Sequence, residues 1–114
     1  MTLVVQDDDG TVTGANGYVT VQYFKDYHDA RGNAYASLLP SDAAIGRAII
    51  KATDYVDQRF YFRGSRAHPA ADQPTAWPRL GAVDDDDNLI CGVPEALKRA
   101  TAEYALRAAA AARS

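Results

Sequence analysis

The 114-residue sequence is informative first through what it lacks. It has one cysteine, Cys91, so no disulfide can form within the chain. One cysteine and two histidines in the whole sequence make a structural zinc site an unfavoured interpretation. Its longest uninterrupted apolar run is five alanines, Ala108 to Ala112. This run is too short for a membrane span or for the hydrophobic segment of a secretory signal. Packing within the chain, or against other chains, must therefore stabilise the fold.

The composition is that of a folded protein of ordinary kind. Apolar residues make up 47% and charged residues 24%, and the length predicts a single domain over residues 1–114. Twelve basic and fifteen acidic residues give a net charge of −3, whereas proteins that coat DNA are usually basic. The charge is segregated: residues 59–79 hold four arginines against one aspartate, and residues 84–87 are all aspartate. Such patches suit a subunit that meets charged neighbours in a fixed orientation.

The order of patterns predicts a mainly α fold: a small bundle of about three main helices with extended additions. Residues 1–19 form an N-terminal extended arm. The turn signal at Asp7–Gly10 predicts either a short hairpin or a loose extended arm. Residues 20–62 are a helical core. Residues 63–93 are a long mid-chain loop, in which Leu80 to Ile90 can fold back as a ribbon with the aspartates at its tip. Residues 94–114 are a long C-terminal helix.

Capping residues set the predicted helix ends. Thr20 caps a helix over 21–30 that Gly32 stops, and Ser41 caps a second helix that ends at residues 59–61. Pro94 is placed at the first turn of a third helix that runs to about Ala112. Arg47, Lys51, Asp54 and Gln58 occupy the solvent face of the second helix. The large core residues expected from the periodicity are Val21, Phe24, Leu38, Leu39, Ile45, Ile49, Val56, Phe60, Leu97, Tyr104 and Leu106.

Charge and small side chains distinguish the third helix. Glu95, Arg99, Glu103 and Arg107 recur every four residues and form a ladder of alternating charge. Leu97, Thr101, Tyr104 and Ala108 are expected to face the core. The terminal alanines favour helix but have little to bury, so this end either docks on a partner or frays.

No segment matches a catalytic motif. No glycine-rich phosphate loop or nucleophile elbow is present, and His28 between Asp26 and Asp29 fits a packed histidine better than a general base. Asp84, Asp86 and Asn88 stand at positions 1, 3 and 5 of the EF-hand calcium-loop pattern, and Glu95 stands at position 12. Leu89 stands where that loop needs glycine, so a solvated turn or an acidic contact is favoured. The sequence predicts no enzyme, no cofactor and no metal.

Residues 59–66, followed by 77–79, interleave arginine with aromatic side chains. This pattern either binds single-stranded nucleic acid, or places Phe60 and Trp77 over the core while the arginines pair with carboxylates. Basic residues do not dominate any helix face, which argues against DNA binding.

Several segments together resemble a family of small tailed-bacteriophage and prophage proteins labelled DnaT-like single-stranded DNA-binding, similar in layout to head–tail connector (adaptor) proteins. The resemblance covers about residues 15–107. It is carried by residues 16–21, 27–32, 52–57, 63–66, 77–79 and 93–105.

The resemblance implies a structural virion protein. A homo-oligomeric ring, commonly a dodecamer, would lie under the portal protein and join it to a downstream neck or tail protein (a stopper or tail terminator). DNA would pass through the channel without sequence-specific binding, and no membrane would be involved. The protein would reside in the virion neck after assembly in the host bacterial cytoplasm. The alternative is a single-stranded DNA-binding accessory protein of phage or prophage replication.

A ring needs two complementary faces, and the basic 59–79 region and the acidic 84–87 tip could supply them. The candidate interface residues are Arg59, Arg63, Arg66, Trp77, Arg79, Asp84, Asp85, Asp86, Asp87, Lys98, Arg99, Arg107 and Arg113.

Overall fold

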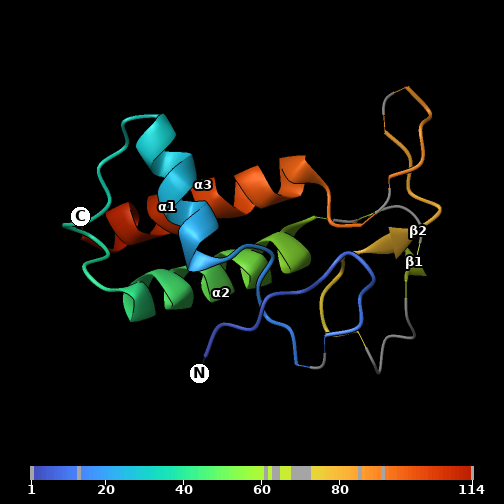
Figure 1. Ribbon diagram of the computed structural model, residues 1–114, viewed down its shortest axis with the longest axis horizontal. Helices are drawn as coiled ribbons and strands as arrows, with labels where there is room; N and C mark the ends of the chain where they lie inside the picture. Colours follow the sequence, from blue (N-terminus) through green and yellow to red (C-terminus); the bar gives the residue numbers. More distant parts are fainter. Residues whose placement is uncertain are drawn as a thin grey trace.

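Three helices form the framework of the computed structural model (Figure 1). They are α1 (Val21–Ala30), α2 (Asp42–Arg59) and α3 (Glu95–Arg113). The structure describes residues 2–12, 14–60, 62, 65–67, 73–84, 86–90 and 92–113, without the side chains of residues 65, 80, 112 and 113. The predicted mainly α fold with three main helices is confirmed.

Local capping explains where the helices begin and end. The Thr20 hydroxyl accepts a hydrogen bond from the backbone N–H of Tyr23 at 2.9 Å, and the Ser41 hydroxyl accepts one from Ala44 at 3.2 Å. Gly32 takes a left-handed φ of +67° just after α1, a conformation that glycine adopts without strain. The predicted caps of α1 and α2 are confirmed, and α3 begins directly after Pro94.

α2 and α3 run in opposite directions side by side, and α1 crosses them (Figure 1). Ile45, Ile49 and Val56 of α2 are buried on the predicted stripe. The facing side of α3 buries mostly small residues, including Ala102 and Ala105, which lets the two helix backbones approach closely. This pair of helices is therefore the centre of the core.

Two residues predicted to be in the core are exposed. Phe60 is 44% exposed because α2 ends at Arg59 and the backbone of Phe60 is extended (φ −111°, ψ 145°), which takes its side chain off the helical stripe. Ala108 is exposed because α2 and α3 leave an open groove beside it. The other large residues predicted for the core are buried or partly buried against it.

The N-terminal arm is extended, as predicted, and Leu3 packs against the chain's own core, but the described residues of the arm do not form the expected hairpin. Its first segment pairs with residues 16 and 17 through a parallel bridge between Val5 and Gly17. The Asn16 side chain accepts from the N–H of Val4 at 2.8 Å, and the Asn16 N–H donates to the Val4 carbonyl oxygen. Asn16 thereby supplies the pairing partner of the first segment. Tyr18, which follows, is fully buried in the core.

The mid-chain segment forms two small antiparallel pairings. β1 (Ser65–Arg66) pairs with β2 (Arg79–Leu80), and Val83 bridges Leu89. The Asp84 N–H donates to the Asn88 carbonyl oxygen at 2.9 Å, and Asp87 takes a left-handed φ of +63° at the tip. The predicted ribbon with aspartates at its tip is confirmed. We call residues 83–89 the acidic hairpin.

A buried polar cluster fastens the arm and the mid-chain segment to the end of α2. The Tyr18 hydroxyl donates to Asp57 Oδ1 at 2.6 Å and accepts from the N–H of Trp77 at 3.1 Å. Asp57 Oδ2 accepts from the N–H of Ala76 at 3.2 Å. Burial raises the pKa of the Asp57 carboxyl above its usual 3.8, although these hydrogen bonds partly oppose the shift.

This raised pKa predicts a specific response to acid. The folded protein takes up the Asp57 proton at a higher pH than the unfolded chain does, so this carboxyl adds stability as pH falls from its raised folded pKa toward 3.8. Urea unfolding of the wild type and of Asp57→Asn, at pH 7 and near pH 4, measures the effect. The free-energy difference between them should move in favour of the wild type at the lower pH. An unchanged or opposite difference would contradict the assigned shift.

Within the described residues, none of the helices combines the length and apolar character that a membrane crossing requires.

Candidate functional site

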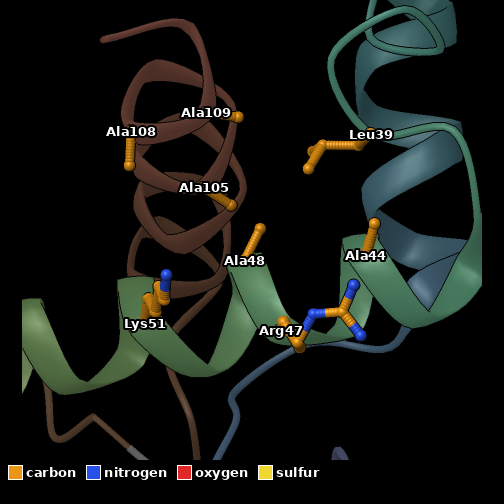
Figure 2. Close-up of a pocket in the computed structure, with 8 residues that line it drawn as sticks. All are labelled: Leu39, Ala44, Arg47, Ala48, Lys51, Ala105, Ala108 and Ala109. Atoms are coloured by element: carbon orange, nitrogen blue, oxygen red, sulfur yellow. The ribbon is translucent and has the colours of Figure 1, made fainter. Parts of the chain in front are cut away.

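An open groove runs between α2 and the C-terminal half of α3. Figure 2 shows one section, of about 220 Å³, with alanines of both helices on its floor and Leu39 on its far wall. A second section of about 270 Å³ is lined by Tyr55, Tyr104 and Arg107. Lys51 and Ala108 line both sections, so the two are continuous. Its alanines are Ala44, Ala48, Ala52, Ala105, Ala108 and Ala109. We call this feature the α2–α3 groove.

One side of the groove is a stripe of exposed cationic and aromatic residues on α2. Arg47, Lys51, Tyr55 and Arg59 follow one another at intervals of four residues, and all are exposed. Because residues four apart lie on the same face of a helix and each residue rises 1.5 Å, the stripe is about 18 Å long. It presents three positive charges in a row, with Tyr55 among them.

The aromatic part of the groove is a pair of tyrosines. The rings of Tyr55 and Tyr104 lie 5.1 Å apart, tilted by 60°, with one ring from each helix. Tyr55 is 47% exposed, and it is among the most exposed large apolar residues of the described chain. A ring that is held by a neighbour yet open to solvent on one side offers a flat surface for stacking.

The charge of the groove is positive and little neutralised. Within the described ranges neither Arg47 nor Lys51 forms an ion pair. Arg107 pairs with Glu103 at 3.5 Å, but the Arg107 side chain is mostly exposed and such a pair contributes little. Asp54 is an exposed acidic residue on α2 near the stripe. The groove thus carries more positive than negative charge in a protein whose net charge is −3.

This arrangement suits an extended anionic ligand with flat rings. Cations bind phosphates, aromatic faces stack on bases, and an open groove admits a strand whose bases are not paired. Within the described chain no three acidic, histidine or cysteine side chains lie together as a metal site requires.

Residues 59–79 do not form one basic and aromatic surface in the described chain. Trp77 is 5% exposed and its ring meets the edge of Phe62 at 5.5 Å, as the core interpretation of this stretch predicted. Arg66 Nε donates to the Thr75 carbonyl oxygen at 3.1 Å, and Arg79 donates to that of Ala76 at 3.0 Å. These arginines therefore bind backbone carbonyls and not carboxylates in these contacts. Only Arg59 of this set belongs to the groove stripe.

The other predicted interface residues lie on separate surfaces. Asp84, Asp86 and Asp87 are exposed on the acidic hairpin, and Lys98 and Arg99 lie in the first half of α3. Arg99 faces Glu95 at 3.7 Å, as the predicted charge ladder requires. Arg107 lines the groove. Arg63, Asp85 and the side chain of Arg113 lie outside what the structure describes.

His28 and Asp84 form hydrogen bonds that stabilise the fold. His28 is 0% exposed, with Nε2 3.0 Å from the Ala102 carbonyl oxygen and Nδ1 3.1 Å from the Asn33 amide nitrogen. The role of a packed, hydrogen-bonded residue is confirmed. Asp84 Oδ1 accepts from the N–H groups of Asp86 and Asn88, which forms the turn. Glu95 instead accepts from the Tyr23 hydroxyl at 2.8 Å.

The groove was not predicted as a site from the sequence. Neither Tyr55 nor Tyr104 was named as a functional residue, and Lys51 was not grouped with Arg107. On α2 the cations and Tyr55 recur every four residues, on a solvent face that Asp54 and Gln58 share. That spacing was visible in the sequence, but Asp54 and Gln58 on the same solvent face obscured it. No pattern in the sequence indicated that Tyr104 and Arg107 of α3 line the groove, because their place beside α2 depends on how the two helices pack.

The chain belongs to the family described as "Putative DnaT-like ssDNA binding protein", whose model matches residues 1–114. That description concerns nucleic-acid binding and is not that of an enzyme family. No curated protein and no solved structure matches the chain.

Proposed function

We propose that this protein binds single-stranded DNA along the α2–α3 groove. The observation that carries the proposal is the exposed stripe of Arg47, Lys51, Tyr55 and Arg59 beside Tyr104 and Arg107. Phosphates contact the cations, and one or two bases stack on the tyrosines. The family description supports the same function. Because the net charge is negative, the affinity is modest and depends on this local surface alone.

A salt titration tests the proposal. Fluorescence anisotropy of a short labelled oligonucleotide would give the dissociation constant at several salt concentrations. The three cations that line the groove, together with Arg59 at the end of the stripe, predict about four phosphate contacts, so the logarithm of the binding constant should fall with that of salt with a slope of about −3. The absence of binding at low salt, or binding without salt dependence, would refute the proposal.

A duplex of the same sequence is the matched control. Its bases are stacked on one another, so they cannot stack on Tyr55 and Tyr104, and only phosphate contacts remain. Binding to the duplex should therefore be weaker than to the single strand. Equal affinity for the two would argue for charge attraction without base stacking.

The second candidate function is that of a head–tail connector subunit. It is favoured by a specific observation: the acidic hairpin and the cationic groove are dissimilar surfaces, and the hairpin segment lies toward the end of the molecule away from the C-terminus of α3 (Figure 1). A ring needs two different faces on each subunit. In this interpretation the portal and a downstream neck or tail protein are the partners, the ring is a dodecamer, and DNA passes through the channel. Electron microscopy of virions would locate the protein in the neck if this function is correct.

A further inference from the structure

The described residues of the acidic hairpin place an exposed apolar residue next to exposed carboxylates. Leu89 is 71% exposed, and it is the most exposed large apolar residue of the described chain. Asp86 and Asp87 are exposed beside it, and neither forms an ion pair with a described residue. Backbone bonds within the hairpin, and from Ile90 to Ala82 at 2.9 Å, hold its shape. Little order therefore has to be created when it binds.

The α2–α3 groove has the complementary features. Its 220 Å³ section has an apolar floor of alanines and Leu39, with Arg47 and Lys51 at its rim (Figure 2). Alanines leave space for one larger apolar side chain from outside. The two cations are unpaired within the described chain and can meet carboxylates.

The hairpin cannot reach the groove of its own chain. α3 starts beside the hairpin and ends at the groove section drawn in Figure 2, on the opposite side of a molecule about 40 Å long (Figure 1). Any contact between these surfaces must join two copies. Since the surfaces differ, the contact is heterologous and leaves each copy with a free hairpin or groove for the next.

We infer that the groove binds the acidic hairpin of a second copy, with Leu89 on the alanine floor and Asp86 and Asp87 at Arg47 and Lys51. Charge complementarity between two unpaired surfaces favours this occupant. If the groove binds single-stranded DNA as proposed above, this contact also regulates DNA binding. The hairpin and a DNA strand need the same cations, so self-association and DNA binding compete.

A charge exchange between two variants tests the inference. The hairpin variant is Asp86→Lys with Asp87→Asn, because asparagine tolerates the left-handed φ at position 87 and Asp84 is kept to form the turn. The groove variant is Arg47→Glu with Lys51→Glu. Sedimentation velocity at low salt should show concentration-dependent association of the wild type and none of either variant alone. The mixture should associate, because Asp86 and Asp87 of the groove variant meet the intact Arg47 and Lys51 of the hairpin variant. The lysine hairpin can in addition meet the glutamate groove.

Two outcomes would overturn the inference. The wild type could stay monomeric at all concentrations, or the mixture could fail to associate although circular dichroism shows that both variants are folded. Competition is read by adding an oligonucleotide, which should dissociate the wild-type assemblies. The hairpin variant separates the two proposals because its groove is intact. If it fails to bind an oligonucleotide while the mixture associates, the DNA-binding proposal fails and the self-association stands.

Discussion

Reversing two charges in the α2–α3 groove should abolish single-stranded DNA binding. In Lys51→Glu with Arg107→Glu, two phosphate contacts become repulsive. Charge-assisted hydrogen bonds contribute about 1.5–3 kcal/mol each, so their loss alone predicts an affinity at least roughly 100-fold lower. Both side chains are exposed, and thermal unfolding should change little. Anisotropy with the labelled oligonucleotide gives the measurement.

The matched control reverses the same two residue types elsewhere on the protein. Lys98→Glu with Arg99→Glu changes the net charge equally but lies in the first half of α3, outside the groove. It should bind DNA within about threefold of the wild type at moderate salt, since distant charges at the surface are screened. If the two double variants lose affinity equally, total charge and not the groove is responsible.

Tyr55→Ala completes this series. The loss of one stacking surface predicts weakening by about 1–3 kcal/mol while the salt slope stays unchanged.

Replacing His28 by alanine should produce the largest loss of stability of any single change considered. A carbonyl oxygen can only accept, so Nε2–H donates to Ala102 and Nδ1 accepts from the Asn33 amide. The ring also meets Phe24 and Tyr27 edge-on at 4.5 and 4.9 Å. Removing a buried ring costs about 3–5 kcal/mol, which for a chain of this size lowers the melting temperature by about 15 °C. Differential scanning calorimetry measures it.

His28→Phe separates packing from hydrogen bonding. It keeps a ring in the same space but leaves the Ala102 and Asn33 groups without their partner, at a cost of about 1–3 kcal/mol. The expected order of stability is wild type, then His28→Phe, then His28→Ala. Gln22→Ala, an exposed position on the same helix, should change stability by less than about 0.5 kcal/mol. A His28→Ala protein that melts within a few degrees of the wild type would show that the ring does not join α1 to α3.

Features that depend on neighbours along the chain were predictable. Thr20, Ser41 and Gly32 set helix ends through bonds and dihedral angles within a few residues, and the spacing of Ile45 and Ile49 identified the buried face of α2. The ribbon over Leu80 to Ile90, with aspartates at its tip, was also predicted, and its pairings join residues close together in the sequence. The prediction for Phe60 failed because a periodic pattern does not show at which residue the helix stops.

The sequence by itself determined the three helices, their buried faces and the acidic turn, because short-range hydrogen bonds and a period of 3.6 residues act within each segment. Only the tertiary structure decided that Asn16 fastens the arm to Val4, and that Tyr104 and Arg107 lie across from Tyr55 and Lys51. Those contacts join residues far apart in sequence. The contacts between α2 and α3 depend on how closely the small residues of α3 let it approach α2, a distance that no local pattern encodes.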